Sequence, residues 1–383
     1  MIGVELKATH TQTRKANGDI LVDKVKTIVG PWKGGKFMPL SLRCHSANTY
    51  CLPKVWFRSA SIDIRIGDIN QITSCVKSWL YADQLIKPEE LVLYKTRQMG
   101  GLNLINVKYR AMSELIKSFL DTAINPTFRR SIYHQALFSW HVEGVRSIPD
   151  PGRPPFYSVE FFAAIKAVQG QGLLRLSTMS IGMWYRALLE IYVTQETDEN
   201  NFIFSVPCKI ERQSPNISWE TIWPLITLPG LDSSDCSFLF CLLHNLLTTQ
   251  ERLHRVLSHK VTSTTCTLCL QEVTCDQLHA LVHCPFNNNV GLWLIRCLRK
   301  LIPTLQPVQL LTMNFGFDQN HDDAFPAVWL SAKTLLLVWS SRLTKKATTI
   351  TTTRAMLEAN IMLLRKTRFN IHADSLENLI STS

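Results

Sequence analysis

The sequence predicts a mainly α-helical protein with minor β structure. Apolar residues recur every three or four positions over most of the chain, which is the spacing of one helix face. Alternation typical of strands is confined to short runs. The chain has 383 residues, of which 46% are hydrophobic, so it is long enough and apolar enough for two or three domains with ordered cores.

The first 148 residues contain most of the strand-like signals. Residues 2–6, "IGVEL", alternate like a strand, and the polar stretch after them ends in a turn predicted at Asn17 and Gly18. The run "LVLY" at 91–94 also reads as a strand, and the double glycine before "LNLINV" reads as a turn. Helical spacing predicts helices over 19–29, over 38–62 with a bend or end at Pro53, over 67–81 and over about 107–123.

The proline-rich run "PDPGRPPF" at 149–156 is the clearest linker, because prolines and glycine suppress regular structure. After it, helical patterns return, with Trp184 and Leu188 expected in a core. A later amphipathic helix is expected to turn Leu292, Ile295 and Leu298 inward. The predicted regions are a helical region 1–148, the linker 149–156, a helical connection 157–250, a Cys/His region 251–290, basic helices 291–371 and a disordered tail 372–383.

The stretch from Cys266 to Cys284 has the composition and spacing of a zinc site. A Cys-x-x-Cys turn lets the thiolates of Cys266 and Cys269 converge on one ion, and a short helix over 276–284 can deliver His279 and Cys284 to the same point. Three thiolates and one imidazole leave no open coordination position. The prediction is therefore a structural Zn site rather than a catalytic one.

Other interpretations of this stretch stay open at this point. His283 could replace His279, Cys275 is a fifth candidate ligand, and free cysteines also pack well as small apolar side chains. Disulfides are a poorer explanation, because the eleven cysteines are an odd number and the N-terminus has no apolar core of a signal peptide. We expect a nuclear or cytoplasmic protein that is not secreted.

The charge of the chain predicts an acidic partner. The formal net charge is +11, which favours nucleic acid first and an anionic membrane second, and no apolar run approaches the roughly 18 residues that span a bilayer. Basic residues outside the apolar helix stripes are the predicted phosphate contacts, although each also fits a solvated helix surface. They are Lys95, Arg97, Lys108, Arg110, Lys117, Arg129, Arg130, Arg296, Arg299 and Lys300.

Several motifs resemble, in order, those of reverse transcriptases from LINE-type (non-LTR) retrotransposons. "IGVEL", "ANTYCLPKVW" and "MGGLNLINVKYRA" are similar to the segment that follows the polymerase palm, and "TTQERLHRVL" before the Cys/His run is similar to the approach to that family's zinc knuckle. The resemblance covers most of residues 1–295. It implies a thumb-like helical region whose residues 40–130 grip template and primer, and a knuckle that binds RNA or target DNA. Cys275 departs from the family, which has an acidic residue ahead of the histidine.

No catalytic site is recognisable in the sequence. A polymerase needs paired carboxylates that hold two divalent metal ions. The adjacent pair Asp322 and Asp323 lacks flanking strands, Asp83 stands alone, and the resemblance implies that the palm carboxylates precede Ile2. We therefore expect nucleic-acid binding without polymerisation and without a small-molecule substrate. The alternative is a domesticated helical scaffold, held together by zinc, whose partner is a protein.

Overall fold

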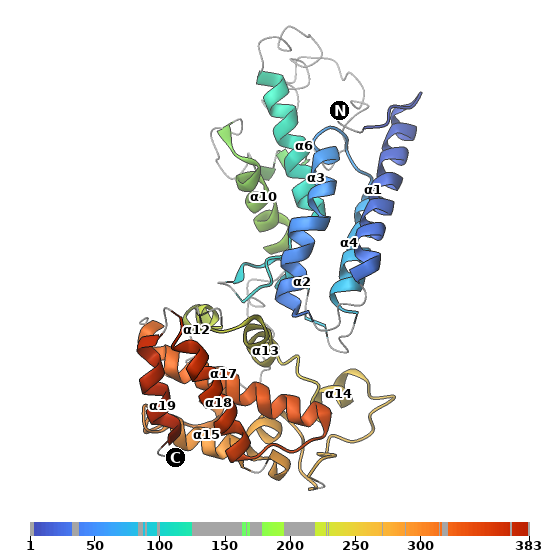
Figure 1. Ribbon diagram of the computed structural model, residues 1–383. Helices are drawn as coiled ribbons and strands as arrows, with labels where there is room; N and C mark the ends of the chain where they lie inside the picture. Colours follow the sequence, from blue (N-terminus) through green and yellow to red (C-terminus); the bar gives the residue numbers. More distant parts are fainter. Residues whose placement is uncertain are drawn as a thin grey trace. The chain divides into compact units, whose positions relative to one another are not determined.

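Helices dominate the protein (Figure 1), so the predicted mainly α fold is confirmed. Within the part of the chain that the structure describes, the one β pairing is a bridge between Thr265 and Thr274. Contacts divide the chain into two units, residues 1–38, 43–83 and 104–202, and residues 39–42, 84–103 and 203–383. The structure is a computed structural model that describes residues 4–32, 38–82, 87–88, 90–97, 100–124, 163–165, 167–168, 178–194, 219–226, 228, 230–269, 271–287, 289–313, 315, 321–367 and 370–381.

The first unit is a set of packed helices. They are α1 (His10–Trp32), α3 (Pro53–Ser59), α4 (Ile66–Leu80), α6 (Val107–Ile124) and α10 (Ile181–Leu189). In this unit α1 lies along α4, while α6 packs against α3 and α10 (Figure 1). Trp184 and Leu188 are fully buried between α6 and α10, as their spacing predicted. The predicted linker 149–156 lies outside the described residues.

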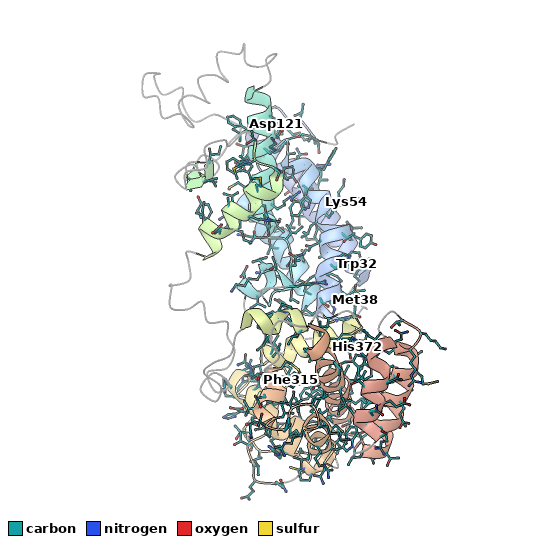
Figure 2. The ribbon with its side chains drawn as sticks, turned by 90° about the vertical axis from the view of Figure 1, so that its left-hand side faces the viewer. Trp32, Met38, Lys54, Asp121, Phe315 and His372 are labelled. Carbon is teal, nitrogen blue, oxygen red and sulfur yellow. The ribbon has the colours of Figure 1, made fainter. Side chains whose placement is uncertain are left out.

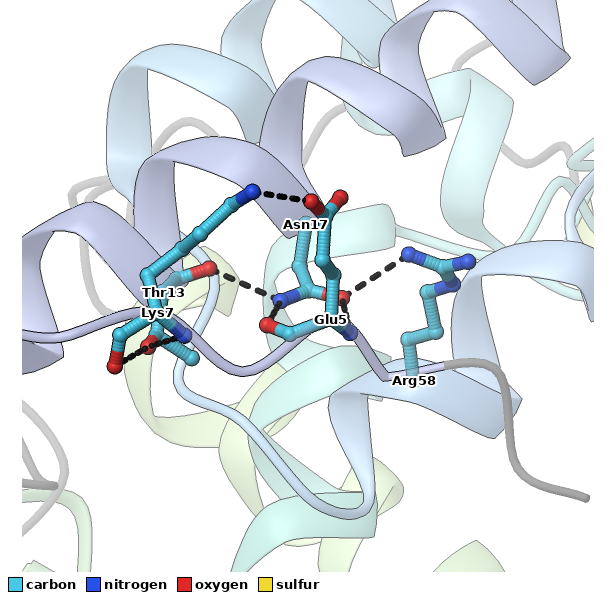
Figure 3. Close-up of polar contacts among 5 residues, drawn as sticks. All are labelled: Glu5, Lys7, Thr13, Asn17 and Arg58. Atoms are coloured by element: carbon cyan, nitrogen blue, oxygen red, sulfur yellow. Dashed lines mark hydrogen bonds and ion pairs between the residues drawn. The ribbon is translucent and has the colours of Figure 1, made fainter.

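The N-terminal strand and the turn after it were wrong predictions. Residues 4–7 form no strand, and α1 already begins at His10 and runs through Asn17. The turn is absent because the Asn17 side chain is buried in α1, where it hydrogen-bonds the Thr13 carbonyl of its own helix and a neighbouring segment. Asn17 Nδ2 donates to the Glu5 carbonyl at 2.7 Å, and Asn17 Oδ1 accepts from Glu5 N at 2.9 Å and Arg58 Nη1 at 2.8 Å (Figure 3).

The helix predicted over 38–62 forms in three consecutive pieces. They are α2 (Leu40–Ser46), a π-turn (Ala47–Cys51) and α3. Pro53 lacks an N–H group and is placed in the first turn of α3, where no intrahelical donor is needed. The wider turn before it closes with Leu52 N donating to Ala47 O at 2.9 Å. The predicted bend at Pro53 is therefore a junction between two helical segments.

The second strand prediction was also wrong. Residues 90–94 form a short helix, α5 (Glu90–Tyr94), and residues 101–106 have no regular structure. The double-glycine turn folds this segment back onto α5, with Leu102 N donating to Val92 O at 3.0 Å. Gly100 has φ +75°, and a Cβ there would lie 2.3 Å from the Trp223 ring. Glycine is required because only it combines this backbone conformation with such a close aromatic neighbour.

The second unit is organised around one long buried helix. Its helices are α12 (Trp219–Leu225), α13 (Ser233–Leu243), α14 (Gln250–Val256), α15 (Val290–Leu298), α16 (Pro307–Thr312), α17 (His321–Thr344), α18 (Ile350–Leu364) and α19 (Ala373–Ser381). α17 packs against α12, α13, α15 and α18. Residues 324–332 of α17 are all buried, as expected of a helix that is apolar on every side.

Two predictions in this unit need correction. The tail 372–383 is not disordered over its described part, because Leu376, Leu379 and Ile380 of α19 are buried against α18 and its neighbours. Leu292 of α15 is 38% exposed rather than inward, since Trp293, Leu294 and Cys297 take the buried face with Ile295 and Leu298. Among the described helices, none is both long and apolar enough to cross a membrane.

Candidate metal centre

The first two candidate ligands sit in a tight turn held by a minimal hairpin. Thr265 and Thr274 form the β bridge, and Cys266 N donates to Val273 O at 3.1 Å beside it. Residues 267–269 form the turn that follows Cys266. The bridge at Thr265 and the turn over 267–269 therefore hold Cys266 and Cys269 at the same end of the hairpin.

The other two candidate ligands come from a π-turn that follows the hairpin. The turn (His279–His283) closes when Cys284 N donates to His279 O at 2.7 Å, which is a five-residue spacing. Asp276 holds its start, because the Asp276 carboxylate accepts from His279 N at 2.8 Å. Cys284 is therefore one turn of π-helix away from His279, and both side chains are buried.

The four predicted ligands meet at one point. The ligand atoms of Cys266, Cys269, His279 and Cys284 all lie within 4.8 Å of one another, so this cluster could hold a metal ion. Cys266 Sγ lies 3.8 Å from Cys284 Sγ, and Cys269 Sγ lies 3.4 Å from His279 Nε2. Bond lengths of about 2.3 Å to sulfur and about 2.0 Å to nitrogen give tetrahedral edges of about 3.8 Å between sulfurs and about 3.5 Å between sulfur and nitrogen.

These two short edges therefore already match a tetrahedral zinc ion. No separation in the cluster is longer than 4.8 Å, at most about 1 Å more than a tetrahedral edge, and small rotations of the cysteine side chains can close such a gap. The donor set of three sulfurs and one imidazole also suits zinc, because soft ligands in a closed tetrahedron are typical of its structural sites.

The alternative ligands do not join this cluster. His283 is exposed, whereas His279 is buried and directs Nε2 at Cys269. Cys275 is buried but lies against Arg342 of α17, whose Nη2 is 3.2 Å from Cys275 Sγ. Cys275 therefore adjoins the site without being part of the four-residue group.

Arg342 was not among the predicted site residues. Its Nη2 also lies 3.5 Å from Cys266 Sγ, so one guanidinium faces two sulfurs. In the sequence Arg342 stands near the end of a helix, where a cation commonly interacts with the last carbonyls. Nothing local links it to a cysteine 76 positions earlier. Only the packing of α17 beside the π-turn brings the two together.

The electrostatics of the cluster concentrate negative charge on one sulfur. Burial opposes ionisation of Cys266, but hydrogen bonds from Arg342 and from the backbone of the Cys-x-x-Cys turn lower its pKa to about 5. Burial raises the pKa of Cys275 and of Cys284 to about 11 in each case. Neighbouring thiols this close cannot all ionise unless a cation compensates their charge. A divalent ion bound between the four side chains would supply that compensation.

The loop that carries the ligands is fastened to the rest of its unit. Gln277 Nε2 donates to Leu242 O of α13 at 3.2 Å, and Asn287 Nδ2 donates to Ala280 O at 3.0 Å. Ser341 Oγ of α17 donates to Asn287 Oδ1 at 3.1 Å. Gly291 allows α15 to approach closely, since a Cβ there would lie 2.5 Å from Leu281 O. The ligand positions are therefore fixed by helices on several sides.

Some of the predicted phosphate contacts pair with acidic residues of their own helix. In the first unit, Arg110 pairs with Glu114 and Lys117 pairs with Asp121, both at 2.7 Å. Lys108 has no acidic partner among the described residues, and its Nζ lies 5.2 Å from the centre of the Tyr109 ring. Arg129 and Arg130 lie outside the described residues.

The remaining predicted contacts belong to the second unit. Arg97 and Arg296 are exposed and Lys95 is half-buried. Arg299 Nε donates to Leu305 O at 3.2 Å, and Lys300 Nζ donates to Leu379 O at 3.0 Å, so these two cations hold backbone carbonyls of their own unit.

Comparison with known proteins adds no relative. No protein-family model matches the chain, and no curated protein matches it.

Proposed function

We propose that Cys266, Cys269, His279 and Cys284 bind a structural zinc ion. The observation that carries this proposal is the convergence of their four ligand atoms, two of whose separations equal tetrahedral edges. Such a site contributes directly to folding, because binding free energy becomes folding free energy when the unfolded chain cannot form the site. It would join the hairpin and the π-turn to the helices of the second unit.

Zinc stoichiometry and its effect on stability test this proposal. We expect one zinc ion per chain by metal analysis, and a lower melting temperature after removal by a chelator. His279→Ala should lose the ion. His283→Ala is the matched control, since its imidazole is exposed and outside the cluster, and it should retain full stoichiometry. Equal zinc content in both variants would refute the assignment of His279.

We further propose that the chain binds nucleic acid, as the thumb-like and zinc-knuckle part of a LINE-type reverse transcriptase. The support is the ordered resemblance over residues 1–295 and the net charge of +11. In such an enzyme this part contributes to copying RNA at a nicked target DNA end. For this chain we propose binding without polymerisation, because the sequence presents no pair of carboxylates with the setting of a two-metal centre.

Salt dependence is the direct test of nucleic-acid binding. Neutralising Z phosphates gives a slope of about −0.9Z in a plot of log affinity against log salt for duplex DNA, and about −0.7Z for a single strand. Retarded migration of labelled RNA or DNA should weaken steadily as salt rises. Affinity that is independent of salt would contradict a backbone-binding role.

A second candidate is a zinc-stabilised scaffold that binds a protein. The observation that favours it is the pairing of Arg110 and Lys117 with carboxylates one turn away, which leaves less positive charge for phosphate than the sequence suggested. If the zinc-loaded chain binds neither RNA nor DNA at low salt, the scaffold is the better explanation.

A further inference from the structure

A long segment near the N-terminus, most of it in the first unit, contains basic residues and no acidic residue. From Lys24 to Ile62 the sequence contains no aspartate or glutamate, between Asp23 and Asp63. The same segment contains seven lysines and arginines: Lys24, Lys26, Lys33, Lys36, Arg43, Lys54 and Arg58. Mixed charges are the norm on protein surfaces, so an acid-free segment of this length favours an anionic partner.

Two of these cations have internal roles. Arg58 Nη1 donates to Asn17 Oδ1, and Arg43 Nη1 donates to Leu80 O at 2.8 Å; both side chains are buried. Lys54 is different, because it is exposed and makes no ion pair with any residue that the structure describes. On α3, Lys54 is therefore the cation that faces solvent, whereas Arg58 is buried.

Lys54 lies between two exposed aromatic rings. Tyr50 is 61% exposed and Phe57 is 58% exposed, and they stand four positions before and three positions after Lys54 on continuous helical backbone. Residues at these spacings share one helix face. Seven residues of helix rise about 10 Å, so the rings are separated by roughly that distance along the axis, with Lys54 between them in the sequence. We call Tyr50, Lys54 and Phe57 the aromatic–lysine stripe.

The Tyr50 ring of the stripe packs against other aromatic rings of the first unit. The Tyr50 ring meets the Trp32 ring edge-on at 6.4 Å, and Trp32 in turn lies 5.0 Å from Trp79. Figure 2 shows Trp32 and Lys54 on the same side of this unit. Trp79 is buried and its Nε1 donates to Trp32 O at 3.1 Å. Tyr50 is thus positioned by the half-buried Trp32, which packs on the buried Trp79, while most of the Tyr50 surface is exposed.

We propose that the aromatic–lysine stripe binds single-stranded nucleic acid, with bases stacked on Tyr50 and Phe57 and Lys54 against the phosphates between them. This inference rests on the proposed nucleic-acid binding and specifies its strand type and contacts. Exposed aromatic rings with interspersed cations are the recognition elements of single-strand binding, because every base offers a flat face for stacking. A duplex offers no such face along its length, so it cannot use the rings.

An apolar protein partner would use the same surface differently. Docking of apolar side chains requires buried area, which leucine supplies nearly as well as phenylalanine, whereas stacking requires a flat ring. The absence of acids from the segment 24–62 also favours a polyanion over a typical protein surface of mixed charge. Leucine substitutions therefore separate the two interpretations.

The experiment measures binding of the full zinc-loaded chain to a labelled single strand of about 16 nucleotides, the upper end of known stacking site sizes. Tyr50→Leu and Phe57→Leu should each weaken binding roughly 5- to 150-fold, which corresponds to losing one stacked base. Tyr50→Phe, which keeps the ring, should bind as the parent does. Lys54→Gln should make the plot of log affinity against log salt less steep, by the amount that corresponds to losing one phosphate contact.

Matched controls come from the same unit. Met183→Ala alters an apolar side chain that is 50% exposed on α10, and Lys15→Gln removes an exposed cation outside the acid-free segment; neither should change the affinity. All substituted side chains are at the surface, so the melting temperature should stay that of the parent. Affinity for a duplex of equal length should be unaffected by Tyr50→Leu and Phe57→Leu.

The outcomes separate this inference from the function on which it rests. A parent chain that binds neither single strands nor duplexes overturns the proposed function itself. A parent chain that binds single strands, together with a Tyr50→Leu/Phe57→Leu variant of equal affinity, overturns the stripe alone. Loss of binding to anionic lipid vesicles in that double variant, with nucleic-acid binding retained, would assign the stripe to a membrane surface instead and overturn the inference.

Discussion

Replacing Arg342 by methionine should weaken binding of the proposed zinc ion without changing any of the four proposed ligands. The guanidinium of Arg342 faces Cys266 Sγ at 3.5 Å and Cys275 Sγ at 3.2 Å. A zinc ion with three thiolates and one neutral imidazole carries a net charge of −1. Arg342 supplies the compensating positive charge from α17, and methionine keeps most of the side-chain length while removing that charge.

The size of the effect follows from the hydrogen bond to a charged sulfur. A hydrogen bond that involves an ionised group contributes about 1.5–3 kcal/mol. Since about 1.4 kcal/mol corresponds to a tenfold change in an equilibrium constant, zinc affinity should fall roughly 10- to 150-fold. Loss of groups that orient or neutralise metal ligands has a similar typical cost, about 10- to 100-fold.

Competition with a chromophoric chelator measures this change. Cobalt substitution provides a second measurement, because the ligand-field bands of a tetrahedral cobalt site report the geometry of the four ligands. Arg342→Lys should give an intermediate affinity, since an ammonium keeps the charge but not the planar array of donors. Arg296→Met is the matched control: Arg296 is an exposed cation of the same unit, on α15, and its removal should leave affinity unchanged.

Two results would refute the reasoning. Zinc affinity of the Arg342→Met variant within twofold of the parent would show that the guanidinium does not compensate the thiolates. Equal losses in the Arg342 and Arg296 variants would indicate a general effect of net charge rather than the contact with Cys266. An unchanged cobalt spectrum with weakened affinity would still agree with the prediction, because Arg342 is not itself a ligand.

Three further predictions concern stability. Burial lowers the pKa of His244 to about 4, below the unfolded value near 6.5, so the folded chain binds fewer protons than the unfolded chain. The free energy of unfolding should therefore fall by roughly 3 kcal/mol at most as the pH drops from about 6.5 to about 4. Urea unfolding across this range should show a smaller loss for His244→Gln, and an equal loss would contradict the role of His244. Gly100→Ala should lower the urea midpoint, because alanine in this left-handed backbone conformation costs about 1–2 kcal/mol and its Cβ clashes with the Trp223 ring. The control Gly30→Ala, which points into open space on α1, should leave the midpoint equal or higher. Asn17→Ala should lower the free energy of unfolding by about 2–4 kcal/mol, because it leaves Arg58 and two backbone carbonyls without their partner. Asn17→Asp should recover part of this loss by accepting a hydrogen bond from Arg58. An alanine variant as stable as the parent would argue against the network of Figure 3.

Periodicity was a good guide to helices and a poor guide to short segments. The helices over 66–80 and 107–124 formed where the apolar spacing predicted them, because each buries a complete apolar face. "LVLY" became a helix since four residues contain too little pattern to distinguish the two periods. Asn17 misled in another way, because its preference for turns is local and its actual hydrogen bonds reach Glu5 and Arg58. Only the tertiary structure reveals those partners.

The candidate metal centre was more predictable than the candidate nucleic-acid surface, and the reason is physical. Metal ligands must be particular residue types at short spacing, so Cys266, Cys269, His279 and Cys284 were identifiable before their geometry was known. A phosphate contact needs only a cation, and a cation has many other uses: Lys300 holds the carbonyl of Leu379, 79 positions away. Sequence shows which cations exist but not which are engaged. Absence of acids is the more informative signal, because lysines in the interior of an acid-free segment have no aspartate or glutamate within a helical turn; in the segment 24–62 a lysine near its edge, Lys26, does have such a neighbour, Asp23 at 3.9 Å.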